Sequence, residues 1–202
     1  MKNDIHFWVA TLVRGVMALL VGSAVLVIPD MATTLLLLPF AVAVSILCLA
    51  AYGILDSATI FTTSFMAASA RARIALCLQG IMGSIVGLLL FFVVFDKVRL
   101  HWFLYLIGLQ ALCTGAAEWV VAKHASTQET SIWNYAASAI AFLCGGAYIA
   151  EAAAFGEDLM PRTVAFLIFG YLVAFGMAEC ITAARMLYAD READIVAAAC
   201  EA

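Results

Sequence analysis

Apolar residues gather along the chain into six long runs that are separated by short polar connections. About 20 apolar residues suffice for a helix to cross the hydrocarbon core of a bilayer, and each run reaches that length. The sequence therefore predicts six transmembrane helices, near residues 7–28, 32–55, 74–95, 100–122, 133–155 and 162–188. The longest polar connection, residues 57–73, is too short for a soluble domain. We expect residues 1–202 to form a single, all-α integral membrane domain.

The composition is that of a membrane protein rather than a soluble one. Hydrophobic residues make up 66% of the chain and charged residues only 12%, with a mean hydropathy of +1.08. Charged residues average about 25% in soluble domains. The net charge of -4 is scattered and no basic cluster is present, so a nucleic-acid partner is not expected. The expected partner is the lipid bilayer.

Positive charges outside the runs are distributed unevenly between the two sides of the membrane. Six Lys and Arg residues fall on the side of the N-terminus: Lys2, Arg71, Arg73, Lys123, Arg185 and Arg191. Three fall on the other side: Lys97, Arg99 and Arg162. Because Lys and Arg accumulate in cytoplasmic segments, both termini are predicted to be cytoplasmic.

Small residues and acids recur at matching positions of the runs. Each odd-numbered run contains two small residues seven apart: Gly15 with Gly22, Gly80 with Gly87, and Ala139 with Gly146. Each even-numbered run ends with a glycine that is followed three residues later by an acid: Gly53 with Asp56, Gly115 with Glu118, and Gly176 with Glu179. A period of about 60 residues contains two spans, so every copy enters and leaves on the same side. The pattern predicts three parallel two-helix repeats, residues 7–65, 72–124 and 132–188, around a pseudo-threefold axis.

The glycines are predicted to be sites of close helix packing rather than ligand-binding loops. Helices in lipid associate through small residues that let their backbones approach each other. The flattest such face belongs to Gly80, Gly83 and Gly87, of which the last two form a G-x-x-x-G pattern. We expect the same packing role at Gly15, Gly22 and Gly146.

The first copy of the repeat resembles a known family. Gly15 and Gly22 are seven residues apart, Pro29 follows after seven more, and Gly53 stands near the end of the next hydrophobic run. This pattern resembles the short repeat of the HdeD-like acid-resistance membrane proteins of bacteria, although the second and third copies lack the proline. The resemblance implies a multi-pass protein of the bacterial inner membrane with a role in acid or envelope stress. It carries over no catalytic or binding residues.

Ionisable side chains inside the runs are candidate functional residues, because a charge in the bilayer costs about 2.5 to 3.5 kcal/mol on insertion scales. Asp56, Glu118 and Glu179 occupy the same position of the repeat, and Arg14 lies at a similar depth from the same side. We expect these four residues to share one polar layer, in which Arg14 contacts at least one acid. The residues that match Arg14 in the other copies are the uncharged Gln79 and Ser138.

The predicted layer supports two interpretations. In the structural one, Arg14 pairs with an acid, and the remaining acids reach water or hydrogen-bond to neighbours such as Gln79 and Ser138. In the functional one, the surplus of carboxylates over Arg14 leaves at least one acid without a cationic partner, and such a group can take up and release protons. Glu151 has no counterpart in the repeat and is expected to reach the outer interface.

The sequence contains no arrangement that is typical of catalysis or metal binding. The six cysteines are isolated, with no C-x-x-C pair, and the three histidines stand at the ends of runs, so we expect no metal and no other cofactor. Because no nucleophile is paired with a base, we expect a non-enzymatic protein. The first expectation is an HdeD-like stress protein. The alternative is a small proton- or ion-coupled transporter or channel that uses the carboxylate layer, alone or as a homo-oligomer.

Overall fold

The computed structural model has one helix at each of the six predicted spans, and these six helices are long and apolar enough to cross a membrane. It describes residues 4–30, 38–65, 67, 69–95, 100–124, 128–156 and 161–201. The helices are α1 (Asp4–Asp30), α2 (Leu38–Ser64), α3 (Ala70–Phe95), α4 (Leu100–Ala122), α5 (Gln128–Phe155) and α6 (Pro161–Glu201). The predicted all-α membrane fold is confirmed.

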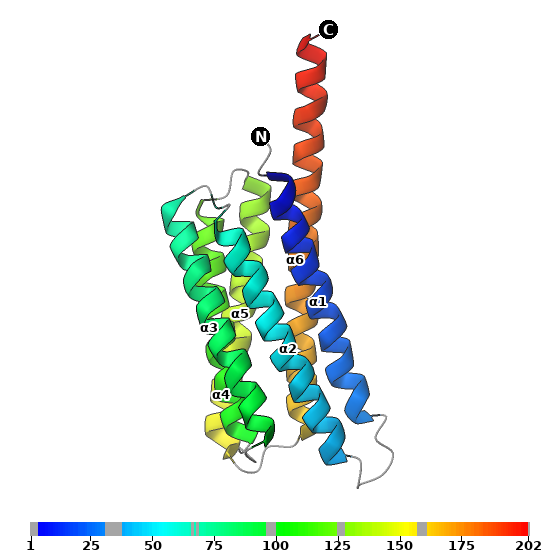
Figure 1. Cartoon of the computed structure of the whole chain (residues 1–202), viewed down its shortest axis with the longest axis vertical. Helices are drawn as coiled ribbons and strands as arrows, with labels where there is room; N and C mark the ends of the chain where they lie inside the picture. Colours follow the sequence, from blue (N-terminus) through cyan, green and yellow to red (C-terminus); the bar gives the residue numbers. More distant parts are fainter. Residues whose placement is uncertain are drawn as a thin grey trace.

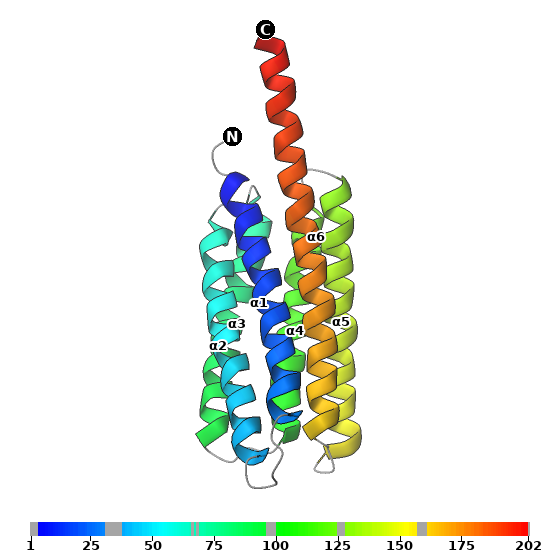
Figure 2. The ribbon, with the colours of Figure 1, turned by 90° about the vertical axis from the view of Figure 1, so that its right-hand side faces the viewer.

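The helices stand side by side in chain order and form a closed ring, because α6 packs against α1 (Figure 1). Both termini lie at one end of the bundle, named the terminal end below, and Figure 2 shows α6 continuing past the other helices there. The contacts alternate in extent around the ring. The more extensive ones join α1 to α6, α2 to α3 and α4 to α5, whereas the two helices of each predicted hairpin share the less extensive ones.

Glycines lie where the helices of the extensive contacts approach each other. A Cβ added to Gly15 would be 2.8 Å from the carbonyl oxygen of Gly176, across the contact between α1 and α6. On Gly87 it would be 3.1 Å from the carbonyl oxygen of Ala50, across the contact between α2 and α3. The backbones can come this close because a side chain is absent. The packing prediction is also confirmed for Gly80, whose added Cβ would lie 3.1 Å from the carbonyl oxygen of Ser57. At Gly22 and Gly83 the added Cβ would meet side chains of the facing helix, Leu172 and Ser57.

The packing prediction is wrong for Gly146. A Cβ added there would meet no heavy atom within 4 Å, and both Gly146 and Ala139 are exposed. The neighbouring Gly145 is the buried one, and its added Cβ would lie 2.9 Å from the carbonyl oxygen of Gly108 on α4. Successive residues are about 100° apart around a helix. The position seven residues after Ala139 is therefore on the side of α5 that faces away from α4, and the position before it faces α4.

The second span ends later than predicted, because α2 continues to Ser64 instead of ending near residue 55. Residues 32–37 of the predicted span lie outside the described residues. The last turns of α2 are rich in hydroxyl side chains, which made this segment look like a polar connection: Ser57, Thr59, Thr62, Thr63 and Ser64. Each hydroxyl donates a hydrogen bond to a carbonyl oxygen three or four residues earlier. Hydroxyls satisfied in this way are compatible with a helix in lipid. Asp56 therefore lies well inside α2.

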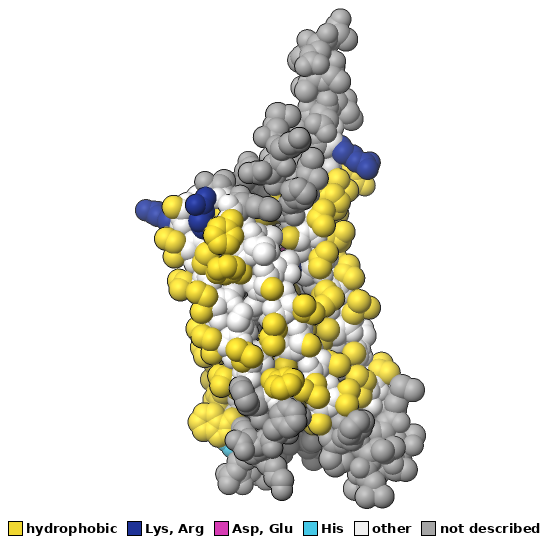
Figure 3. All heavy atoms as spheres, viewed as in Figure 1, with side chains coloured by type: hydrophobic (Ala, Val, Ile, Leu, Met, Phe, Trp, Pro, Cys, Tyr) yellow, Lys and Arg dark blue, Asp and Glu magenta, His cyan; other side chains and the backbone are white. Residues whose placement is uncertain are grey.

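The outer surface of the bundle is apolar. Figure 3 shows hydrophobic side chains over the face in view, with Lys and Arg side chains near the terminal end. Large exposed hydrophobic residues occur on all six helices: Leu20, Leu55, Leu78, Leu109, Leu143 and Phe166. Such a continuous apolar surface is suited to contact with lipid.

Replacing Gly15 with Ala should lower the thermal stability of the purified protein in detergent. The new Cβ would meet the backbone of α6, and overpacking of this kind costs about 1 to 3 kcal/mol. The same change at Gly146 serves as the matched control and should not destabilise, since the space beside it is open. Thermal denaturation of both variants measures the difference. Equal melting temperatures would contradict the packing role of Gly15.

Candidate functional site

The bundle interior holds a cluster of four charged side chains from four different helices. Arg14 of α1 donates a hydrogen bond from Nε to Asp56 Oδ1 at 2.8 Å and from Nη1 to Glu118 Oε1 at 3.0 Å. Its Nη1 also lies 3.7 Å from Glu179 Oε1. The exposed fractions are 7% for Arg14, 8% for Asp56, and 3% for each glutamate. We name these residues the Arg14 cluster. The expected contact is confirmed, and Arg14 pairs with all three acids.

The repeated G-x-x-[DE] motif explains how the acids reach this position. Its glycine faces the neighbouring helix at each extensive contact: Gly53 faces Gly87, Gly115 faces Ser138, and Gly176 faces Gly15. Residues three apart share one side of a helix, so an acid three positions later lies beside the glycine face, one turn closer to the terminal end. Close backbone packing thus directs the three carboxylates to the bundle interior.

Gln79 and Ser138 are buried, as predicted, but are not paired with the Arg14 cluster within the described residues. Gln79 is 2% exposed, and neither end of its side-chain amide has a hydrogen-bond partner in the described part of the chain. Ser138 donates a hydrogen bond to the carbonyl oxygen of Gly115 at 2.7 Å and so links α5 to α4. Glu151 is half-buried on α5 and lies outside the cluster.

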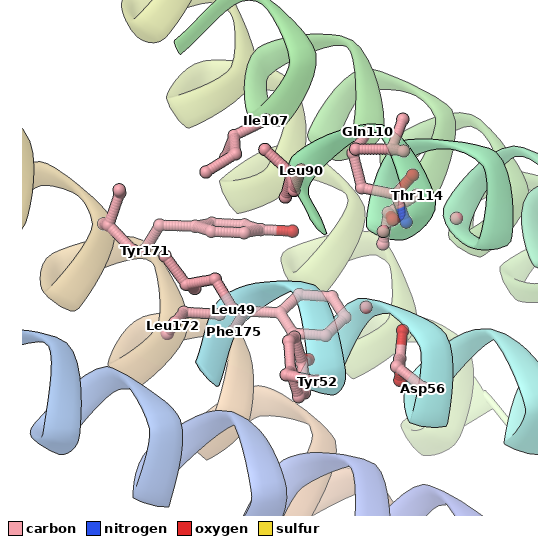
Figure 4. A pocket seen from close by; sticks show the side chains of 15 residues that line it. Leu49, Tyr52, Asp56, Leu90, Ile107, Gln110, Thr114, Tyr171, Leu172 and Phe175 are labelled. Carbon is pink, nitrogen blue, oxygen red and sulfur yellow. The ribbon is translucent and has the colours of Figure 1, made fainter. Parts of the chain in front are cut away.

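Two cavities lie on either side of the Arg14 cluster along the bundle. The far cavity, away from the terminal end, has a volume of about 60 Å³, and Asp56 is the cluster member that lines it (Figure 4). The near cavity, toward the terminal end, has a volume of about 20 Å³ and is lined by Arg14, Glu118 and Glu179. The cluster therefore separates the two cavities, with Asp56 on one side and both glutamates on the other.

Apart from Thr114, which the sequence offers as a hydrogen-bonding neighbour of the acids, the lining of the far cavity was not predicted, although the repeat contains a signal for it. Tyr52, Thr114 and Phe175 each stand four residues before an acid of the repeat, and all three line this cavity. Four residues make about one helical turn, so these positions lie directly beyond the acids. A further turn brings in Gln110 and Tyr171, and Figure 4 shows the Tyr171 ring extending into the cavity.

The chemistry available to the Arg14 cluster is that of its ionisable side chains. Among the described residues, no group of His, Cys, Asp or Glu side chains is placed to hold a metal ion. The groups that can change state at the cluster are the three carboxylates, and their partner is a guanidinium that stays charged.

Comparison with protein-family models, with curated proteins and with solved structures finds no match. The resemblance to the HdeD-like proteins therefore rests on the spacing of Gly15, Gly22, Pro29 and Gly53, and it stays a prediction.

Replacing Arg14 with Gln should destabilise the protein by about 3 to 5 kcal/mol, because it leaves buried carboxylates without their cation. Adding Asp56→Asn should recover part of this loss by removing one of the unpaired charges. Arg162→Gln changes an exposed arginine at the other end of the bundle and serves as the control, with little effect expected. Unfolding in detergent measures all three. A double variant no more stable than the single one would contradict the pairing with Asp56.

Proposed function

We propose that this chain is a non-enzymatic membrane protein that takes up and releases protons at the Arg14 cluster and passes them between the two cavities. The proposal joins the HdeD-like resemblance, which implies a role in acid or envelope stress, to the proton- or ion-coupled transport that the carboxylate layer predicts. The observation that carries it is one guanidinium facing three buried carboxylates.

The charge of the cluster supports proton binding. With all four groups ionised, one positive and three negative charges would leave a net charge of -2 in a site where each residue is at most 8% exposed. Burial and repulsion between like charges both disfavour that state. Two protons would make the cluster neutral. The number of bound protons is therefore the variable through which the cluster responds to pH.

The cavities support movement of protons along the bundle. About 10 to 15 Å³ of cavity volume accommodates one water molecule, so the far cavity of about 60 Å³ has room for several. Asp56 borders this cavity, while Glu118 and Glu179 border the near one. Protonation of either glutamate would weaken its pairing with Nη1 and change how the guanidinium is shared with Asp56. Arg14 thereby couples the protonation of the two sides.

The proposal includes the threefold repeat and the cellular location. The extensive contacts recur three times around the ring, and the three acids come from α2, α4 and α6, as three parallel hairpins would produce. Both termini lie at the same end of the bundle. Arg71 and Arg73, in the first turn of α3, and Lys123, directly after α4, are exposed at the ends of their helices on that side. Under the positive-inside rule, this end faces the cytoplasm of a bacterial inner membrane.

A reporter enzyme that is active only outside the cytoplasm should give no signal when it is fused to the C-terminus. The same reporter inserted between α1 and α2, at the opposite end of the bundle, should give a strong signal. Activity of the two fusions in cells, normalised to their expression, measures the orientation. The reverse pattern would show that the terminal end faces outward.

Proteoliposomes that contain the wild-type protein should dissipate an imposed pH gradient faster than protein-free vesicles when a potassium ionophore compensates the charge. The double variant Glu118→Gln, Glu179→Gln should lower this flux by roughly tenfold or more, because proton transfer loses its relay groups. Glu151→Gln, a matched change outside the cluster, should retain the wild-type flux. A pH-sensitive dye inside the vesicles provides the measurement. Wild-type flux equal to that of empty vesicles would leave the cluster a purely structural element.

A further inference from the structure

The side-chain amide of Gln79 is a buried polar group that the Arg14 cluster does not use. Gln79 is 2% exposed, and within the described residues neither its Nε2 nor its Oε1 has a hydrogen-bond partner. An amide is costly to bury in this state. In the predicted repeat Gln79 matches Arg14 and Ser138, and the Ser138 hydroxyl already donates to the carbonyl oxygen of Gly115. Gln79 is therefore the uncharged counterpart of Arg14 that offers a second polar group both a donor and an acceptor.

The packing of α3 places this amide at the depth of the cluster. Gly83 lines the far cavity, and Leu76 lines the near one. Gln79 is three residues after Leu76 and four before Gly83, so it shares their side of α3. Because the Arg14 cluster separates the two cavities, Gln79 lies level with the charged side chains.

Of the three acids, Glu118 is the one that Gln79 is best placed to meet. Helix α3 packs against α2 and α4, which carry Asp56 and Glu118. Side chains of a helix lean toward its N-terminus, and α3 begins at the terminal end of the bundle. The Gln79 side chain therefore leans toward the near cavity, which Glu118 lines and Asp56 does not.

The lengths of the ion pairs indicate the order in which the acids give up the guanidinium. Arg14 Nη1 is 3.7 Å from Glu179 Oε1, beyond hydrogen-bonding distance. Arg14 holds Asp56 and Glu118 by hydrogen bonds of 2.8 and 3.0 Å. A first proton on Glu179 therefore causes the least loss. The second proton that makes the cluster neutral has to go to an acid that loses a hydrogen bond from Arg14, and that acid needs a new partner.

A protonated carboxyl group and an amide are complementary partners. The O–H of the acid donates to the amide oxygen, and the amide N–H donates to the carbonyl oxygen of the acid. An ionised carboxylate only accepts hydrogen bonds, so it would leave the amide oxygen unpaired. The Gln79 amide thus forms both hydrogen bonds only with an acid that carries a proton.

We propose that Gln79 is a positioning residue of the proton relay, because it becomes the partner of Glu118 when Glu118 takes up the second proton. The inference rests on the proposed function. A proton that arrives through the near cavity, where about 20 Å³ accommodates one water molecule, adds to a carboxylate oxygen of Glu118. The hydrogen bond from Arg14 Nη1 is lost, and two hydrogen bonds to the Gln79 amide replace it.

The groups around Glu118 determine its response to pH. Those that are charged or titratable come from α1, α2 and α6: Arg14, Asp56, Glu179 and Tyr171. Within the described residues, α3 and α5 contribute uncharged polar side chains at this depth: Gln79, Asn134 and Ser138. A change at Gln79 therefore alters the hydrogen bonding of Glu118 without altering the charge around it.

Infrared difference spectra of the purified full-length chain at high and low pH test the inference. The C=O stretch of a protonated carboxyl moves to higher frequency when its hydrogen bond is lost. A carboxyl band that Glu118→Gln removes should appear in the wild type as the pH falls. Gln79→Met should move this band to higher frequency and its midpoint to lower pH by about one unit, the size of one to two hydrogen bonds.

Three further variants control this experiment. Ser84→Ala removes a side-chain hydrogen bond elsewhere on α3 and should leave the band and its midpoint unchanged. Gln79→Asn keeps an amide and should restore part of the shift. Gln79→Leu repeats the test if Gln79→Met does not fold, as judged by thermal denaturation. A Glu118 band that is unchanged in a folded Gln79 variant would overturn the inference, and so would the absence of any band that Glu118→Gln removes.

Proton flux in proteoliposomes separates this inference from the proposed function. Gln79→Met should lower the flux by up to about tenfold at pH values above the midpoint, because a shift of one unit lowers the protonated fraction of Glu118 to that extent. Below both midpoints the flux should equal that of the wild type. Wild-type flux in Gln79→Met at every pH would overturn the inference and leave the proposed function standing. A shifted band without any flux from the wild type would overturn the proposed function and leave the hydrogen bonds between Gln79 and Glu118 in place.

Discussion

A guanidinium in the interior of a membrane bundle has to be paired, and Arg14 meets this requirement with carboxylates from three other helices. The pairing fixes the depth and rotation of α2, α4 and α6 relative to α1, since each must direct one acid to the same guanidinium. The two remaining helices are positioned by packing, because α3 lies against α2 and α5 lies against α4. One buried cation thus sets the register of the whole ring.

The glycine contacts and the charge cluster lie on the same sides of the helices, because each acid of the cluster follows a contact glycine by three residues. Where Gly15 meets Gly176 and Gly53 meets Gly87, the backbones approach closely and the acids beside them turn inward. Close approach at three contacts leaves the other three contacts looser. A groove between α1 and α2, lined in part by Asp56, lies at one of these looser contacts. Helix α2 thus packs closely against α3 on one side, and on its other side the looser contact with α1 leaves Asp56 accessible from the groove.

The parts of the fold that could be predicted from the sequence are those with a local physical signal. Hydrophobic length identified the six helices, and the cost of burying charge identified Arg14 and its acids. The end of α2 was missed because hydroxyl groups that bond to their own helix look polar in a hydropathy count. Gly146 was misassigned because a one-residue error in register rotates a position out of the contact. The cavities depend on which side chains fill the interior once α6 closes the ring against α1, and the repeat predicts the ring but not this filling.

The separation of the paired residues along the chain has a consequence for biogenesis. Arg14 reaches the translocon first, and Asp56 follows 42 positions later on the next helix, so α1 and α2 can leave the translocon as a hairpin whose charges already compensate each other. Glu118 follows Arg14 by 104 positions. When α4 inserts, the Glu118 carboxylate has to replace the group that hydrogen-bonds to Arg14 Nη1 at that stage. Glu179 arrives with α6, the helix that closes the ring. Synthesis thus begins with a hairpin in which Arg14 and Asp56 compensate each other, and both glutamates of the cluster later join a guanidinium that already has a partner.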